Sequence, residues 1–574
     1  MLGLASRARS ARGRVYPTTA LKSALADVDL LDLAPGSSLV GSSVDVSSER
    51  FDGDAFSLAR WAAPDAHGDY LYAPDPPSLA EPFAEVSAYY HLARAARFFA
   101  DRFDFALATP VEAWVSAQTA DGVPYTNAAA SLDEGGHGLI EIGQELPRDG
   151  VVVDYAADGL VLTHEYAHLA FASANDLDDH SDYPINMDAL GLAIAPQALN
   201  EGMSDYWAAT AFDDPDVRPP TASGDRELRR LDVVRRCPDD AWGEAHLDGA
   251  LISSALWAIR SQVGSATADA LGWDLIHQVA GSPTFAEIAA LLSTSADARV
   301  AAGDLDAAGR ARIAAILDER RLPQCGRSFP LADGVPQPGI TPGASSAARL
   351  AMTPDADLCP LLRLAHARLP LALAYAIAVP PEPVRALRVT VDVARFDGAA
   401  ASDGDFLYGL VVRRGAPPEF ELLPLALGDD TVKALKQPTL SDYASPEVAT
   451  PSTTFELTAA DLALVPGETL YLQIVSAHCV DVRTTTTVQW LRPDAAGDDP
   501  DASDASSDAS SARSEDVAAE TARAQDDGCG GGDPDPASSL AVPLALALAA
   551  ALRSWSARAA AARSGRWRAT DPRA

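Results

Sequence analysis

The pattern of apolar residues changes abruptly near residue 330, and this change limits the chain to at least two structural units. From about residue 197 to 320, alanine-rich amphipathic segments follow a helical period. From about 350 to 490, short apolar runs such as ALRVTVDVARF and TLYLQIVSA alternate with turn residues, a texture typical of a β-sandwich. The junction PLADGVPQPGITPG is rich in proline and glycine and indicates a linker.

The N-terminal part of the chain mixes strand and helix signals. Residues 15–75 are expected to form short strands and turns, and residues 109–116 and 137–143 are expected to be strands. A helix is predicted over residues 80–103, where apolar side chains recur at helical spacing, and a second over residues 154–172. The expected fold class is therefore α+β for this part, followed by an all-β domain.

The C-terminal part differs from both units. Residues 493–536 consist mainly of Asp, Ala, Ser and Pro and contain almost no large apolar residues, so this segment buries too little apolar surface to fold. It ends in GCGGG and is followed by an apolar run at residues 540–552 and by six arginines. This run is shorter than the ~20 residues that a stable membrane span prefers. The apolar run can alternatively be interpreted as part of a plain alanine-rich helix.

The charge of the chain excludes one class of partner. The formal net charge is −37, whereas nucleic-acid binding requires a basic face. Such an acidic chain suits a soluble protein that works outside the cell or at high salt. The first 14 residues are basic but lack the apolar stretch of a secretory signal peptide.

The five cysteines do not form a CxxC pair, so a cysteine zinc site is not expected. Cys237 and Cys325 flank the helical region, and Cys359 and Cys479 flank the β-rich region. Two disulfides are one interpretation, and they would require an oxidising compartment. Buried free thiols are the other. Cys529 is left over, in the segment expected to be disordered.

The sequence Thr163-His-Glu-Tyr-Ala-His168 is an HExxH motif. On a helix, His164 and His168 face the same side, so both imidazoles can reach one metal ion. Glu165 lies where it can contact a water molecule on that metal. Zinc lowers the pKa of such a water to near 7, and a carboxylate can then take its proton as the water attacks a carbonyl.

A third metal ligand is expected in the segment NEGMSD, residues 200–205. Glu201 supplies a carboxylate on a second predicted helix, which leaves a fourth position open for water. Asp205 follows one helical turn later, where it can accept a hydrogen bond from the far nitrogen of a ligand histidine. Asn200 is grouped with Asp205 as a residue that supports the ligands.

A further histidine, His246, precedes the apolar helix ALISSALWAI. A histidine at a helix start can donate to an oxyanion as a tetrahedral intermediate forms. The alternative is a purely structural histidine.

These motifs, in the order HEYAH, NEGMSDYWA and AHLDGALISSALW, resemble the fungalysin and thermolysin families of gluzincin metallopeptidases. The resemblance covers roughly residues 15–325 and implies a thermolysin-like two-lobe domain with zinc at its centre. It also implies that Asn127 and Ala128 begin an edge strand that binds the substrate backbone, and that His246 stabilises the transition state. Related enzymes bind calcium, so Ca²⁺ is a second candidate cofactor, in the acidic insert between His168 and Glu201.

The expected organisation follows from these observations. It comprises a basic segment (1–14), a peptidase domain (15–328, with an α/β lobe to about 172 and a helical lobe from about 197), a linker (329–349), a β-sandwich (350–492), a disordered linker (493–536) and a tail (537–574).

The GCGGG segment, the apolar run and the arginine cluster resemble C-terminal sorting tails of myxobacterial surface proteins. This resemblance implies an extracellular or cell-surface protein that contacts the membrane and the export and sorting machinery through its tail. The arginine-rich end would stay cytoplasmic, with the catalytic domain outside.

The sequence therefore predicts a monomeric zinc endopeptidase that acts on extracellular proteins or peptides. Two alternatives remain. One is a zinc aminopeptidase, which needs a group that binds the free amine of the substrate. The other is a surface-binding protein with a vestigial peptidase domain.

Overall fold

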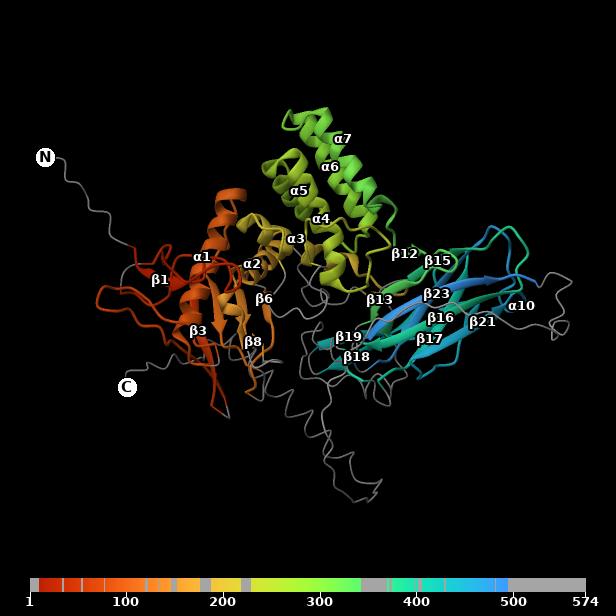
Figure 1. Cartoon of the computed structure of the whole chain (residues 1–574), viewed down its shortest axis with the longest axis horizontal. Coiled ribbons are helices and arrows are strands. Elements are labelled where there is room, and N and C mark those ends of the chain that lie inside the picture. The colour runs from red at the N-terminus through yellow and green to blue at the C-terminus, as the bar shows by residue number, and fades with distance from the viewer. Residues whose placement is uncertain are drawn as a thin grey trace, which may run out of the picture.

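The computed structural model describes residues 10–33, 36–52, 55–76, 78–118, 122–133, 135–145, 152–175, 187–217, 229–341, 369–370, 374–396, 398–400, 405–427, 430–478, 480 and 482–493. Within these residues the fold is a mixed α and β structure with several sheets (Figure 1). The α+β class expected from the sequence is therefore observed.

The N-terminal region is built on a five-stranded sheet with the order β4-β3-β5-β7-β6. Strands β3 (Val44–Phe51), β5 (Val111–Val115) and β7 (Gly138–Ile142) run parallel to one another. Strands β4 (Phe56–Ala59) and β6 (Ala128–Leu132) close the two edges in antiparallel orientation. A small hairpin, β1 (Arg12–Val15) with β2 (Ala26–Asp29), precedes the sheet, so structure begins inside the segment assigned to residues 1–14.

Two helices pack against this sheet. Helix α1 (Pro82–Phe103) lies where the apolar spacing predicts a helix, over residues 80–103, but begins later than predicted. It contacts β3 and β5. Helix α2 (Gly159–Ala174) contacts β6 and β7. The prediction that α2 starts at Asp154 was wrong. Residues Tyr155–Ala157 form a 3-10 turn, and Asp158 then caps α2 by accepting hydrogen bonds from the backbone N–H groups of Leu160 and Val161.

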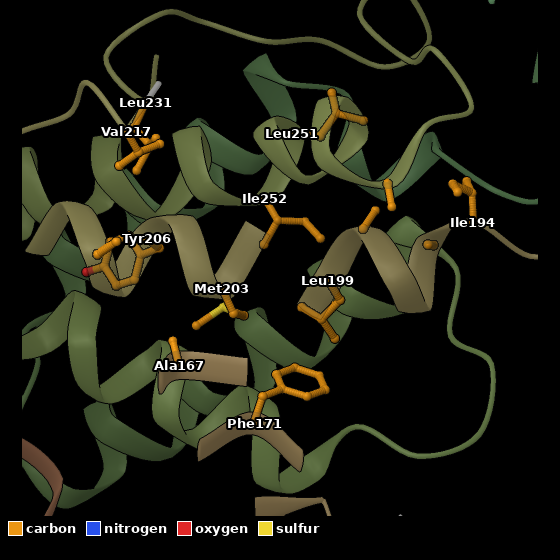
Figure 2. Packing of buried hydrophobic residues seen from close by; sticks show 14 of the residues in the cluster. Ala167, Phe171, Ile194, Leu199, Met203, Tyr206, Val217, Leu231, Leu251 and Ile252 are labelled. Atoms are coloured by element: carbon orange, nitrogen blue, oxygen red, sulfur yellow. The ribbon is translucent and has the colours of Figure 1, made fainter. Parts of the chain in front are cut away.

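The helical region consists of α3 (Ala195–Phe212), α4 (Ala245–Val263), α5 (Ser265–Gln278), α6 (Phe285–Ala302) and α7 (Ala307–Glu319). Between α3 and α4 the described residues, 213–217 and 229–244, form no helix, so the expectation of an almost wholly helical run was wrong there. Figure 2 shows the core in which α2, α3 and α4 meet, with Met203 between Ala167 and Ile252. These three helices carry all the metal-site residues predicted from sequence.

The C-terminal region is all-β from β12 (Ser328–Pro330) to β23 (Val482–Leu491) apart from one short helix, within the described residues. One sheet has the order β13-β23-β16-β21, in which β16 is Ala386–Arg395 and β21 is Ser452–Thr458. The other contains β12, β15, β22 (Thr469–Ser476), β17 (Tyr408–Arg414) and β20 (Tyr443–Ala444), with β14 (Leu369–Pro370) paired to β22. The hydroxyl of Tyr408, in β17, donates to the carbonyl of Val391, in β16 of the other sheet. The two sheets therefore face one another as layers of a β-domain, shown in green to blue in Figure 1.

The segment expected to be a linker, residues 329–349, has a different role over its described part. Strand β12 pairs with β15 (Ala374–Ala378), and β13 (Gln337–Thr341) pairs with β23. Proline is tolerated here because β12 and β13 are outer strands of their sheets. The β-domain thus begins at the end of the helical region without a free linker over these residues.

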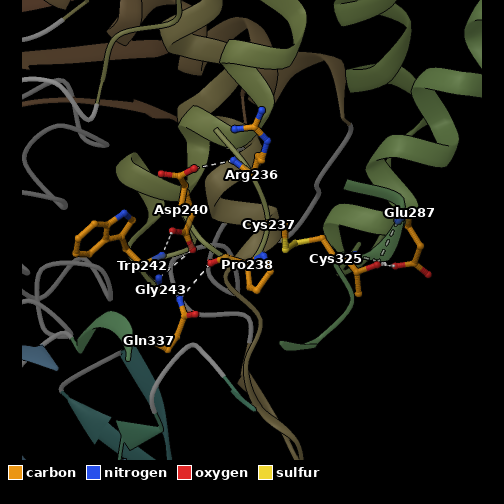
Figure 3. Close-up of a disulfide and its surroundings, with 11 residues drawn as sticks. Arg236, Cys237, Pro238, Asp240, Trp242, Gly243, Glu287, Cys325 and Gln337 are labelled. Carbon is orange, nitrogen blue, oxygen red and sulfur yellow. Dashed lines mark hydrogen bonds between the residues drawn. A yellow bond between two sulfur atoms is a disulfide. The ribbon is translucent and has the colours of Figure 1, made fainter. Parts of the chain in front are cut away.

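Cys237 and Cys325 form a disulfide, as one interpretation of the cysteine spacing predicted (Figure 3). It ties the loop before α4 to the end of the helical region. Cys359, Cys479 and Cys529 lie outside the described residues, as do the tail and residues 176–186 of the acidic insert. Within the described part of the chain, no helix is both long and apolar enough to cross a membrane.

The disulfide closes a loop with a sequence separation of 88 residues. The Cys237→Ala/Cys325→Ala double variant should lose about 4–5 kcal/mol of unfolding free energy, because the unfolded chain regains the entropy of that loop. Urea unfolding of the wild type and the double variant, each with and without reductant, measures this loss. Reductant should destabilise the wild type more than the double variant, which lacks this bond. Equal sensitivity of both proteins would contradict a stabilising role for this bond.

Candidate metal centre

Helix α2 places His164 and His168 one turn apart on its buried side. Their Nε2 atoms lie 2.9 Å apart, and the two rings stand almost perpendicular. Both side chains are mostly buried, at 9% and 14% exposure, and both lie close to Glu201 of α3. The pair can therefore present two lone pairs to one point.

Helix α3 adds the carboxylate of Glu201. Its Oε2 atom lies 3.1 Å from Nε2 of His164 and 3.7 Å from Nε2 of His168. The two Nε2 atoms and the carboxylate oxygen, from two helices, thus lie close enough to bind one metal ion. An oxygen and two nitrogens with lone pairs repel one another at such distances unless a cation or a proton lies among them.

The far nitrogen of each histidine also has a polar partner. Nδ1 of His164 is 2.9 Å from Oδ1 of Asp205, and Nδ1 of His168 is 3.1 Å from the hydroxyl of Ser204. The Asp205 carboxylate accepts a hydrogen bond from Nδ1–H of His164, which leaves Nε2 as the nitrogen that can bind a metal. Asp205 therefore lies where the sequence predicted a supporting residue.

Arg229 holds Asp205 from the opposite side. Its Nε atom donates to Oδ2 of Asp205 at 3.1 Å, and its Nη2 atom donates to Oδ1 at 2.5 Å. Asp205 is only 1% exposed, and burial alone would raise the pKa of its carboxyl, but Arg229 and His164 outweigh burial and lower it. The carboxylate stays ionised beside His164.

These charges favour a cation at the point where the donors converge. Burial would lower the pKa of His164, yet Asp205 and Glu201 outweigh burial and raise that pKa to about 10. Burial would likewise raise the pKa of Glu201, but the imidazoles of His246 and His168 hold it well below its usual range. The field that stabilises a proton on His164 also stabilises a metal ion.

Glu165 completes the group on α2. Ligand-type atoms of His164, Glu165 and His168 all lie within 4.8 Å of one another, and Glu165 is 7% exposed. This group is able to hold a metal ion, with Glu165 beside it.

His246 faces the same centre from the first turn of α4. Its Nε2 atom is 3.4 Å from Oε2 of Glu201, and its Nδ1 atom is 2.7 Å from Oε1 of Glu244. The other oxygen of Glu244 caps α4 by accepting the N–H of Leu247. Burial lowers the pKa of His246, but Glu201 and Glu244 outweigh it and raise that pKa. Because 46% of the side chain is exposed, His246 lines an accessible side of the centre.

The approach of α4 to α3 depends on two glycines. A Cβ atom on Gly202 would lie 2.5 Å from the carbonyl oxygen of Gly249, and one on Gly249 would lie 2.8 Å from the backbone nitrogen of Gly202. The two helices therefore meet backbone to backbone, one residue from Glu201. This contact sets the distance between Glu201 and His246.

Three further residues predicted from the sequence take no part in the contacts described above. Asn200 is buried, but its Oδ1 atom has no hydrogen-bond partner among the described residues. Asn127 is exposed, and its carbonyl accepts the N–H of Gly143. Ala128 begins β6, the outer strand of the sheet beside α2.

Sequence reasoning missed four contributors: Ser204, Arg229, Glu244 and the glycine pair. Ser204 and Glu244 stand within the motifs, so their proximity to the histidines was a usable signal. Arg229 gave no such signal, because it lies 24 residues beyond its partner Asp205.

Comparison with known proteins adds no assignment, since no family model and no curated protein matches this chain.

Proposed function

We propose that this protein is a zinc-dependent endopeptidase that hydrolyses peptide bonds of extracellular proteins or peptides. The observation that carries the proposal is the convergence of His164, His168 and Glu201, with Glu165 beside them and His246 opposite. Two histidines, one carboxylate and an open position are the donor set of catalytic zinc sites.

The donor spacing fits zinc. A tetrahedral ion with bonds of about 2.0–2.1 Å separates its ligand atoms by roughly 3.3 Å. The three separations among His164, His168 and Glu201 are 2.9, 3.1 and 3.7 Å, which bracket that value. His164, His168 and Glu201 would hold the ion, which when bound supplies a Lewis acid for a water molecule and a carbonyl.

Glu165 and His246 have separate roles in the proposed reaction. Glu165 accepts a proton from the attacking water and can pass it to the leaving amine. His246 is favoured in its protonated form, so its Nε2–H donates to the oxyanion of the tetrahedral intermediate. Glu244 fixes the orientation of His246 through Nδ1.

The outer strand β6 supports a binding mode for an extended substrate. An outer strand offers unpaired backbone groups to which a peptide can add as a further strand. We assign Asn127 and Ala128 to this role, in line with the resemblance to fungalysin and thermolysin. A thermolysin-like pair of lobes, an exported location and a tail that contacts the membrane belong to the same proposal.

Glu165→Gln should retain about one zinc per chain while hydrolysis falls by at least about 10²-fold, because the proton acceptor is lost and the ligands remain. Glu201→Gln should lose zinc as well as activity. Metal analysis beside a quenched-peptide assay measures both quantities. Peptides with free and blocked N-termini separate an endopeptidase, which cleaves both, from an aminopeptidase. Undiminished cleavage by folded, zinc-loaded Glu165→Gln would refute the mechanism.

Asp205→Asn should weaken zinc binding by about 10- to 100-fold, because His164 loses its charged acceptor. Asp232→Asn is the matched control, since Asp232 pairs with the neighbouring Arg230 on the exposed surface. Competition with a zinc chelator gives both affinities. Equal affinities for the two variants would show that the Arg229–Asp205–His164 chain does not support the metal.

Zinc binding to the apoprotein should release protons. The pKa of His164 is raised to about 10, so this histidine is protonated at pH 7 and must lose a proton before its Nε2 binds metal. Apparent affinity should therefore rise with pH, by up to about tenfold per pH unit for one proton, up to the raised pKa. Calorimetry in buffers of different ionisation enthalpy counts the protons. A pH-independent affinity between pH 6 and 8.5 is incompatible with this account.

A further inference from the structure

The β-domain contacts the chain segment that leads into the catalytic histidine. This segment, Pro238–Gly243, runs along the free side of β13. The side-chain amide of Gln337 donates to the carbonyl of Pro238 at 3.1 Å, and the N–H of Ile340 donates to the carbonyl of Trp242 at 2.5 Å. Figure 3 shows Gln337 reaching toward Pro238 next to Trp242 and Gly243.

Asp248 holds the same segment from within α4. Its carboxylate is fully buried and accepts the N–H groups of Trp242 at 2.6 Å and Gly243 at 3.0 Å. Burial raises the pKa of Asp248 to about 8 despite these two bonds. Asp248 thus ties α4 to the segment that β13 contacts.

The β-domain also contacts the segment that leads into α3. Arg327, the residue directly before β12, pairs with Asp188 at 2.7 and 2.8 Å and donates to the carbonyl of Gly191. The N–H of Phe420 donates to the carbonyl of Ala189 at 2.8 Å. These contacts fix the turn between β10 (Met187–Asp188) and β11 (Gly191–Leu192), immediately before α3.

The contact of β13 with Pro238–Gly243 matters because this segment leads directly into the residues that hold His246. Gly243 is followed by Glu244, whose carboxylate holds Nδ1 of His246 and caps α4. Because His246 is 46% exposed, packing of its own side chain does not fix it. Its position depends on where Glu244 enters the helix, and Asp248 and β13 determine that entry from two sides.

We propose that the β-domain is part of the catalytic apparatus. Strand β13 and the buried carboxylate of Asp248 clamp the Pro238–Gly243 segment and thereby position Glu244 and His246, with Asp248 as a positioning residue. This inference rests on the proposed peptidase function for its kinetic consequence. Its structural part, the restraint of the segment, stands independently of that function.

The test uses the full chain and four variants. Asp248→Asn removes one of the two acceptors, and Gln337→Ala removes the side-chain bond from β13 while the backbone bond of Ile340 remains. Asp306→Asn, at the N-terminus of α7, and Gln489→Ala, on the exposed face of β23 in the same sheet as β13, are the matched controls. Readouts are zinc per chain, kcat and KM on a quenched peptide, and amide hydrogen exchange across residues 238–249. The Asp248→Asn and Gln337→Ala changes are repeated in a His246→Ala background.

Asp248→Asn and Gln337→Ala should increase exchange across residues 238–249 and lower kcat on the order of 10- to 100-fold, with zinc content and KM unchanged. In the His246→Ala background the same changes should have little further effect on kcat, because they act through that histidine. Both control variants should match the wild type.

Two results would overturn the proposal: unchanged exchange in both variants, or an equal loss of kcat with and without His246. If the wild type binds no zinc and cleaves nothing, the proposed function fails, and the exchange data alone then decide whether β13 and Asp248 restrain the segment.

Discussion

The candidate centre depends on the contact between α3 and α4 at Gly202 and Gly249. A Cβ atom on either glycine would lie within 3 Å of the other helix's backbone. Glu201 and His246 are anchored on either side of this contact, and their side chains meet at 3.4 Å as a result. A larger residue at the crossing would force the two helices apart, so the geometry of the candidate centre depends on the absence of two side chains.

A second constraint is the charge that this packing buries. Glu201 and Asp205 are carboxylates in a region of low dielectric, where an unpaired ion costs several kcal/mol. Arg229 and the imidazoles offset that cost, and the pKa values of both carboxyls fall as a consequence. The same charges raise the pKa of His164 to about 10. The centre is therefore organised around a positive charge at its middle, which suits a metal ion.

The surrounding fold restrains the ends of the helices that carry the site. Asp158 caps α2 and Glu244 caps α4 through backbone N–H groups. The Cys237–Cys325 disulfide holds the loop before α4 against the end of the helical region, and β13 contacts the same loop from the β-domain. Local hydrogen bonds define each helix, while long-range contacts define how the helices enter the site.

The sequence by itself determined several of the elements and pointed to the candidate metal-binding residues. Helical spacing predicted α1, and the HExxH spacing put His164 and His168 on one face of α2, because both follow from the period of a single helix. Asp205 was likewise predictable from its place one turn after Glu201. Only the tertiary structure decided the pairing of Arg229 with Asp205, the crossing at Gly202 and Gly249, and the use of the expected linker as strands β12 and β13. Each of these joins residues distant along the chain, and local periodicity carries no information about which distant backbone comes close.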